Sequence, residues 1–155
     1  MVYRPKPNEH HARLHALLGD WEGDETLKAS PWGPGGGAVG RFTNSLAIDG
    51  FYVISDYVEY RKGRVAFRGH GVYGWDDVQR TYVWWWFDSV GIPSYQPARG
   101  DWHGDQFVMV LEQGGAQVRY THTFEAEGRF RFTIESSQDG KSWGQLMVAH
   151  YRRVG

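Results

Sequence analysis

Hydrophobic and polar residues alternate along most of this chain, which is the pattern of strands that are buried on one face. Beyond the N-terminal segment, runs of β-branched and aromatic residues are separated by turn pairs such as Asp49-Gly50, Lys62-Gly63 and Asp139-Gly140. These turns recur about every 13 residues, which leaves long strands that follow one another directly. The pattern predicts an all-β fold, an antiparallel up-and-down barrel of about ten strands.

One segment near the N-terminus has helical spacing instead. Asn8 can cap a helix, because its side chain can accept backbone N–H groups of the first turn. Leu14 and Leu17 then recur at helical spacing until Gly19 ends the segment. We therefore predict a short N-terminal helix over about 8–18.

The stretch 30–37 is too rich in glycine and proline for regular structure. It predicts a loop, which is either a mobile loop at the mouth of the barrel or a plain surface connector. No domain boundary interrupts the alternating pattern elsewhere, so residues 1–155 are expected to form a single domain.

Short turns determine which residues face one another, because side chains alternate with period two on both strands of a hairpin. A two-residue turn at 49–50 sets Asn44 opposite Ser55. A second turn at 62–63 sets Ser55 opposite His70, so these three side chains are expected on one face. That face is the more apolar of the two, and we assign it to the barrel interior.

The interior face therefore combines apolar side chains with a contiguous polar group. The apolar members are Phe42, Leu46, Val53, Trp85 and Phe87. The polar members are Asn44, Ser55, Tyr57, Arg68 and His70. Unpaired polar groups are costly to bury, so this group predicts a wet cavity with a bound ligand. The alternative interpretation is a network that satisfies its own hydrogen bonds with nothing bound.

The expected ligand is a small, partly apolar molecule with an anionic or carbonyl group. In this interpretation Arg68 and Tyr57 hold the polar group, since a charge-assisted arginine contact is the strongest interaction available in such a cavity. His70, Asn44 and Ser55 complete the hydrogen bonds. The predicted function is small-molecule binding.

An enzyme is the alternative function. Tyr57 and His70 could serve as acid and base on a small carbonyl compound, with Arg68 stabilising an oxyanion. Such a site suits an isomerase, cyclase or hydrolase. Glu25 is a further candidate for this site, because Trp21, Gly23 and Glu25 alternate onto one face and make a carboxylate–imidazole pair with His70 conceivable.

The outer face of the same strands carries large rings. Trp84 and Trp86 are expected to cover Gly71 and Gly69, which is a known arrangement of aromatic residues over glycine in sheets. With Tyr73 and Tyr82 these rings would form an exposed apolar patch. Such a patch predicts a homodimer interface formed by Trp84, Trp86, Tyr82 and Tyr73.

The C-terminal strands are ambiguous. A two-residue turn at Glu127-Gly128 would place Arg119 inside the barrel, on the face that carries Phe130, Phe132 and Ile134. A four-residue turn at 138–141 would add Gln145, Met147 and Ala149 to the same face. The opposite face, with Tyr120, His122 and Phe124, is nearly as apolar. The direction of His122 therefore stays open, whereas the same register turns His150 outward.

Composition excludes several other classes. The 17 Lys and Arg balance 18 Asp and Glu, so the formal charge of −1 provides no footprint for nucleic acid or an anionic membrane. The chain has no Cys, which excludes disulfides, iron–sulfur clusters and a thiol nucleophile. No apolar run approaches the ~20 residues of a spanning helix, and the segment 1–5 has no signal-peptide core. We expect a cytoplasmic protein.

His11 and His15 have a spacing that could hold a metal, but an exposed polar helix face is the favoured interpretation and no metal site is predicted.

Several short motifs resemble known barrels. The Gly-x-Trp-x-Gly motif at 19–23, after a short helix, is similar to that of the lipocalin (calycin) barrels and the nitrobindin group. Together with the segments 71–76, 137–143 and 151–153, it resembles a bacterial family of lipocalin-like barrels for which no activity is established. The resemblance implies a ten-stranded barrel whose closed end is plugged by Trp21.

The more distant resemblance to nitrobindin implies haem as an alternative cofactor, held by a histidine near the last strand. His150 is the candidate by position. The chain departs from the nitrobindin pattern, because no Pro-His-Leu segment precedes its last strand. Apart from this alternative, no cofactor is predicted, and the expected partner is a small molecule.

Overall fold

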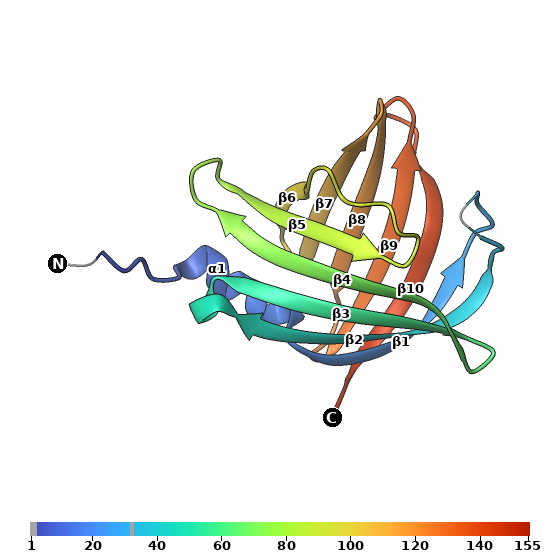
Figure 1. Cartoon of the computed structure of the whole chain (residues 1–155), viewed down its shortest axis with the longest axis horizontal. Helices are drawn as coiled ribbons and strands as arrows, with labels where there is room; N and C mark the ends of the chain where they lie inside the picture. Colours follow the sequence, from blue (N-terminus) through green and yellow to red (C-terminus); the bar gives the residue numbers. More distant parts are fainter. Residues whose placement is uncertain (1–2, 32) are drawn as a thin grey trace.

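The computed structural model describes residues 3–31 and 33–155. In this part of the chain ten strands form a closed antiparallel barrel, in which each strand pairs with its neighbours in sequence and β1 pairs with β10 (Figure 1). The strands are β1 (Gly19–Leu27), β2 (Gly36–Ala47), β3 (Tyr52–Arg61), β4 (Arg64–Asp76), β5 (Thr81–Asp88), β6 (Ala98–His103), β7 (Gln106–Gln113), β8 (Ala116–Phe124), β9 (Arg129–Ser137) and β10 (Gly144–Val154). The predicted ten-stranded barrel with a short N-terminal helix is confirmed.

The predicted helix consists of α1 (Glu9–Arg13) and a 3₁₀ turn, η1 (Leu14–Leu17). Asn8 caps α1 by accepting the backbone N–H groups of its first turn, and the side chain of His11 accepts the N–H of Asn8 in return. The leucines at both ends of η1 are each 1% exposed. Figure 1 shows these helices at one end of the barrel, with the connection between β1 and β2 at the other end. The helices therefore close the floor.

The C-terminal end of the predicted loop 30–37 belongs to a strand in the structure. Strand β2 already begins at Gly36, and Ser30 and Gly33 pair through backbone hydrogen bonds. Trp32, within the predicted loop, lies outside the described residues. Within residues 3–31 and 33–155, none of the helices has the length and apolar character that crossing a bilayer requires.

The hairpin between β2 and β3 has the predicted register. Asn44 pairs with Ser55 and Phe42 pairs with Tyr57. Asn44 is 8% exposed and Ser55 is 1% exposed, so this face points into the barrel.

The next hairpin contains a β-bulge that the sequence analysis did not predict. Glu59 pairs with Phe67 whereas Tyr60 pairs with Val65, so Ala66 is an extra residue in β4. An extra residue reverses the facing of every side chain that follows it. The predicted register of β4 is therefore wrong beyond the bulge.

The facing of β5 is also the reverse of the prediction. Odd-numbered residues of β4 pair with even-numbered residues of β5, as the predicted turn requires, so β5 follows β4. Gly71 pairs with Trp86, and Tyr73 pairs with Trp84. A Cβ atom on Gly69 would lie 2.0 Å from the ring of Trp86, and one on Gly71 would lie 2.6 Å from Nε1 of Trp84. The tryptophans cover the glycines as predicted, but inside the barrel.

Strands β8 and β9 resolve the ambiguous C-terminal face. His122 pairs with Phe132 and Phe124 pairs with Phe130, because the connection between these strands is longer than two residues. His122 therefore faces inward. Arg119 faces outward, where its Nε lies 3.1 Å from a carboxylate oxygen of Glu135.

Gln145 is exposed, because β10 has a register shift between Gln145 and Met147. The predicted inward positions of Arg119 and Gln145 are thus both wrong. Met147 and Ala149, which were assigned to the face of Phe130 and Phe132, are buried in the interior as expected.

Two clusters of buried side chains fill the barrel near its floor. One joins the helical leucines to Val53, Tyr82 and Phe107, among others. The other contains Trp21, which is 1% exposed and donates its indole N–H to the carbonyl of Leu17 at 2.9 Å. Trp21 thus ties the first strand to the helix at the closed end.

Candidate functional site

The half of the barrel away from α1 holds a cavity of about 410 Å³. Its rim includes Lys28, Ser30 and Pro34 from the connection between β1 and β2, and Arg61 and Ala66 from the hairpin between β3 and β4. The wall is largely aromatic. Nine of the lining residues are phenylalanine, tyrosine or tryptophan, namely Phe42, Tyr57, Phe67, Tyr73, Trp84, Trp86, Tyr120, Phe132 and Tyr151. A volume of this size suits a small organic molecule.

At the polar end of the cavity Glu25 lies behind Tyr57 and Tyr151 of the lining, and β1 carries it inward together with Trp21, as predicted. Glu25 is 2% exposed. Tyr57 donates its hydroxyl to the carboxylate, with distances of 2.8 and 2.7 Å to Oε1 and Oε2, and the hydroxyl of Tyr151 donates to Oε2. Gly40 makes room for this group, because a Cβ atom there would lie 2.0 Å from Oε2 of Glu25.

Burial controls the protonation of this cluster. It raises the pKa of Glu25 to about 7, against the opposing effect of the hydrogen bonds from Tyr151 and Tyr57, and the nearby carboxylate of Glu59 raises it further. Burial and the adjacent Glu25 raise the pKa values of Tyr57 and Tyr151 as well. Near neutral pH, Glu25 therefore exchanges its proton while both phenols keep theirs.

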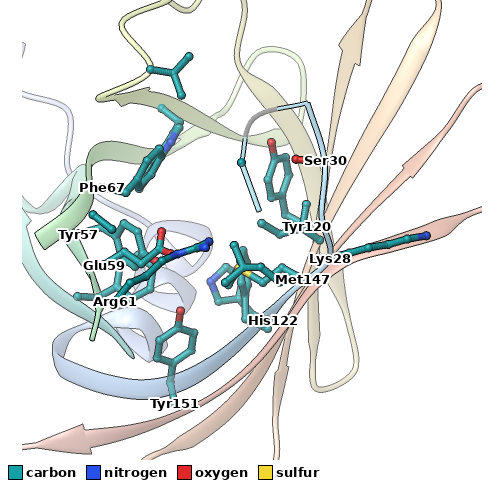
Figure 2. Close-up of a pocket in the computed structure, with 18 of the residues that line it drawn as sticks. Lys28, Ser30, Tyr57, Glu59, Arg61, Phe67, Tyr120, His122, Met147 and Tyr151 are labelled. Carbon is teal, nitrogen blue, oxygen red and sulfur yellow. The ribbon is translucent and has the colours of Figure 1, made fainter. Parts of the chain in front are cut away.

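A second carboxylate lies at the same end. Glu59 is 6% exposed, and one of its oxygens lies 2.9 Å from Nε of Arg61. Arg61 also donates from Nη1 to the carbonyl of Pro34 at 2.8 Å, so it links β3 to the connection between β1 and β2. Figure 2 shows Tyr57, Glu59 and Arg61 together on one side of the cavity.

His122 lies across the cavity from this group (Figure 2). Its ring is 5% exposed and packs 4.7 Å from the ring of Phe132 and 5.2 Å from that of Phe130. Burial lowers the pKa of His122 to about 3, so the imidazole is neutral. Within residues 3–31 and 33–155, neither Nδ1 of His122 nor Nε1 of Trp84 has a hydrogen-bond partner.

The predicted polar constellation is split between the two faces of the wall. Tyr57 lies in the cavity, but Arg68 and His70 are exposed on the outside because of the bulge at Ala66. His70 places Nδ1 2.7 Å from a carboxylate oxygen of Asp56 on the outer face. The conceivable pair of Glu25 with His70 is therefore wrong.

Two further polar residues of that constellation are buried outside the cavity lining. Asn44 donates from Nδ2 to the carbonyl of Leu17 at 2.8 Å and so anchors the helix. Ser55 lies beside it on β3 and is 1% exposed. Both belong to the closed half of the barrel, below the cavity.

The predicted apolar lining is also divided. Phe42 lines the cavity and Val53 is fully buried in the core near the floor. Leu46 and Phe87 are 45% and 44% exposed, respectively. Trp85 lies on the outer face, because β5 follows the reversed facing of β4.

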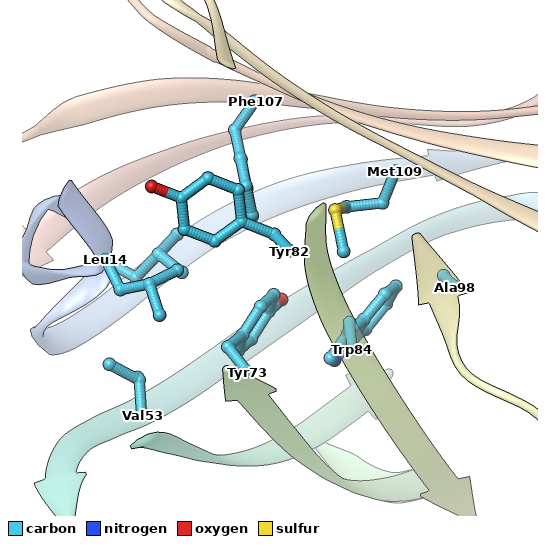
Figure 3. Packing of buried hydrophobic residues seen from close by; sticks show 9 residues of the cluster. Leu14, Val53, Tyr73, Tyr82, Trp84, Ala98, Phe107 and Met109 are labelled. Atoms are coloured by element: carbon cyan, nitrogen blue, oxygen red, sulfur yellow. The ribbon is translucent and has the colours of Figure 1, made fainter. Parts of the chain in front are cut away.

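The rings that were expected to form an outer dimer patch are inside the barrel. Figure 3 shows Tyr73, Tyr82 and Trp84 packed in the same cluster as Leu14 and Phe107. These three aromatic residues are at most 6% exposed. The fourth member, Trp86, lines the cavity. The predicted homodimer patch is therefore wrong, because the prediction assigned these inward-facing rings to the outer face.

The haem alternative does not fit the position of its candidate ligand. His150 is exposed on the outer face of β10, where it pairs with Asp24 and Arg131 in the sheet. A group bound in the cavity is on the other side of the wall.

Sequence reasoning missed Glu59, Arg61 and Tyr151 as residues of the site, and it left the direction of His122 open. The signal for two of them was present. Glu59 follows Tyr57 by two residues on β3, and Tyr151 follows Ala149 by two on β10, so alternation alone places each on an inward face.

Solved structures with this fold exist at low sequence identity. Rv2717c from M. tuberculosis has a TM-score of 0.67 with this chain, at 13% identity, over 96% of this chain and 99% of that chain. The S-type phycobiliprotein lyase CPES from Guillardia theta has a TM-score of 0.64, at 12% identity, over 96% of this chain and 99% of that one. At such identities the likeness concerns the fold.

In sequence, the model of the family described as "Protein of unknown function (DUF1579)" matches residues 6–153. Among curated proteins, none matches this chain at a significant level.

Proposed function

The chain belongs to the DUF1579 family, and we propose that it is a binding protein for a small, largely apolar molecule that occupies the barrel cavity. One observation carries the proposal. A cavity of about 410 Å³ has a largely aromatic wall, and two of its lining residues, His122 and Trp84, each have a buried ring nitrogen with no partner within the described residues. The lipocalin-like motif at 19–23 supports the same class of function.

The physical reason is the cost of an empty apolar cavity. Wall atoms without neighbours lose dispersion contacts, and each unpaired buried polar group costs about 1–3 kcal/mol. A barrel selected only for stability would fill the space with aliphatic side chains. A ligand with rings and one or two polar groups removes both costs at once.

The enzyme alternative needs different residues from those predicted, because His70 is outside the barrel. Tyr57 lines the cavity and Glu25 behind it has a pKa of about 7, which is suited to proton transfer near neutral pH. As a second candidate function we infer acid–base chemistry on a bound carbonyl compound. Turnover of such compounds that disappears in Glu25→Gln would support it, and turnover that survives would eliminate this arrangement.

The binding proposal is tested with the uncharged fluorophore N-phenyl-1-naphthylamine. We expect saturable, one-to-one fluorescence enhancement. Ile134→Trp should weaken binding at least about tenfold, because Ile134 lines the cavity and the larger ring fills it. Thr133→Trp is the matched control, since its side chain lies on the outer side of the same strand.

Arg68→Ala is a second control and should also leave binding unchanged, because Arg68 is exposed outside the barrel. Circular dichroism in the near ultraviolet verifies that each variant is folded. Absence of binding to the native protein, or equal binding by folded Ile134→Trp, would refute the proposal. A cytoplasmic location stays a prediction from the sequence.

A further inference from the structure

The carboxylates at the polar end of the cavity outnumber the available cations. Glu25 and Glu59 are 2% and 6% exposed, and Arg61 is bound to Glu59 at 2.9 Å and to the carbonyl of Pro34 at 2.8 Å. The other cation among the described lining residues, Lys28, is exposed and extends away from this group in Figure 2. When Glu25 is ionised, it therefore has no ion-pair partner among the described residues, and Arg61 stabilises its charge only from a greater distance.

Aromatic rings surround this end of the cavity. The ring of Phe42 lies 4.5 Å from that of Tyr57 and 5.2 Å from that of Tyr151. The rings of Phe67 and Trp86 each lie 6.0 Å from that of Tyr57. The faces of such rings carry partial negative charge and attract cations, most strongly where water is excluded.

The hydroxyl groups add acceptors to the same end. While Glu25 is ionised, the phenolic hydrogens of Tyr57 and Tyr151 are both donated to it, so any further hydrogen bond to these hydroxyls must come from a donor. An anionic group placed here would meet two carboxylates. A cationic N–H donor would meet a carboxylate, phenolic oxygens and aromatic faces.

We propose that the ligand carries a protonated amine, which binds at the acidic end of the cavity beside Glu59 and the rings of Phe42, Tyr57 and Trp86. The charge of Glu25 acts on it from behind the hydroxyls of Tyr57 and Tyr151. This inference rests on the proposed binding function and names the class of its ligand. It replaces the anionic or carbonyl group that was expected from an inward Arg68.

The unpaired nitrogen of His122 supports a ligand at this place through a separate observation. His122 is 5% exposed, lines the same cavity and lies across it from Glu59 (Figure 2). Its Nδ1 has no partner within the described residues. A molecule with its ammonium group beside Glu59 and an apolar body along the aromatic wall approaches this imidazole with its other end.

Binding of a cation also has a consequence for protons. The pKa of Glu25 depends on Tyr57, Glu59 and Arg61 of β3 and on Tyr151 of β10. Strand β2 carries Ala38 and Gly40 beside Glu25, and neither has a titratable side chain. Burial raises the pKa of Glu25 to about 7, so the carboxyl group is mostly protonated at about pH 6. An ammonium group stabilises the carboxylate, and Glu25 then releases its proton to the solvent as the ligand binds.

The test compares two indoles of similar shape and opposite charge, tryptamine and indole-3-propionate, as competitors of N-phenyl-1-naphthylamine. We expect tryptamine to displace the fluorophore at a concentration at least about tenfold lower than indole-3-propionate does. Glu25→Gln and Glu59→Gln should each reduce this preference at least about tenfold while the fluorophore still binds. Asp56→Asn is the matched control, because it removes a carboxylate from the outer face of the same strand.

Calorimetry at about pH 6, in two buffers of different ionisation enthalpy, supplies a second readout. Tryptamine should release a proton from the native protein and not from Glu25→Gln. If the fluorophore binds but indole-3-propionate competes as well as tryptamine, or if both glutamine variants keep the preference, the ligand class is wrong and the binding function stands. If the fluorophore itself does not bind, the proposed function fails.

Discussion

The hydroxyl of Tyr57 on β3 reaches across β2 to the carboxylate of Glu25 on β1, at 2.8 and 2.7 Å from its two oxygens. The intervening strand allows this contact because it carries Gly40 at that level. Two strands that are not neighbours in the sheet are thereby joined through the interior. The same bond positions the acidic group that distinguishes this cavity from an apolar one.

Removing the hydroxyl of Tyr57 should destabilise the protein more at high pH than at low pH. A hydrogen bond to a charged acceptor contributes about 2 kcal/mol, and one to a neutral group about 1 kcal/mol. For Tyr57→Phe we therefore expect the free energy of unfolding in urea to fall by about 2 kcal/mol at about pH 8, where Glu25 is ionised, and by about 1 kcal/mol at about pH 5. Tyr60→Phe, on the outer side of the same strand, serves as the control. Equal losses at both pH values would contradict this account.

Glu25 should make the fold less stable as the pH rises. Its pKa is about 7 in the folded protein and 4.5 ordinarily, so the unfolded chain releases this proton first. The contribution is fully present below about pH 4.5 and is lost as the pH rises through 7. The free energy of unfolding of Glu25→Gln minus that of the native protein should therefore rise by about 3 kcal/mol from about pH 4 to about pH 8. Chemical denaturation across this range measures the difference, and a flat difference would show that Glu25 ionises normally.

His122 should have the opposite effect at acid pH. Its pKa falls from 6.5 to about 3 on folding, so the unfolded chain takes up a proton that the folded protein does not. This stability is present above about pH 6.5 and is lost as the pH falls toward 3. A phenylalanine at position 122 fits among the rings of Phe130 and Phe132. Between about pH 7 and about pH 4, the free energy of unfolding of His122→Phe should therefore fall by about 3 kcal/mol less than that of the native protein.

His150→Phe controls for the loss of an exposed histidine in the preceding experiment, because His150 lies on the outer face. The acid dependence of the unfolding free energy should change more in His122→Phe than in His150→Phe. The account of His122 fails if His122→Phe keeps the acid dependence of the native protein.

Gly100 is expected to be irreplaceable for steric reasons. A Cβ atom there would lie 1.7 Å from the backbone oxygen of Val108 on the paired strand β7, and a backbone atom cannot rotate away. Gly100→Ala should lower the midpoint of thermal unfolding substantially, with a loss of about 3 kcal/mol, the upper end for overpacking. Gly144→Ala is the matched control, since a Cβ atom at Gly144 meets nothing within 4 Å. Similar melting temperatures for the two variants would refute this expectation.

The fold could be predicted from the sequence because its determinants are local. Alternation and turn pairs identify the strands, and the tight turn near Asp49 sets the correct pairing of Asn44 with Ser55. The facing of β4 depends instead on the bulge at Ala66, which is an irregularity with no signal in the alternating pattern. That single residue removed Arg68 and His70 from the site.

The C-terminal half of the site could not be predicted from the sequence for a related reason. Both faces of β8 are nearly equally apolar in sequence, so the pattern does not select the inward one. The choice is made by the length of the connection to β9, which pairs His122 with Phe132. Glu25 was assigned to the interior correctly, but its partners Tyr57 and Tyr151 come from other strands, and the closure of the barrel brings them to it.

The extra residue at Ala66 also bears on how this cavity can diverge. Deleting one codon at that position would turn Arg68 and His70 inward and Gly69 and Gly71 outward, without altering the identity of any remaining amino acid. Two basic side chains would then face the same lumen as Glu25 and Glu59, which lie on β1 and β3 and keep their facing. A change of one residue in hairpin length can therefore alter the charge of such a lumen in a single mutational event, whereas substitutions at its lining positions act one side chain at a time.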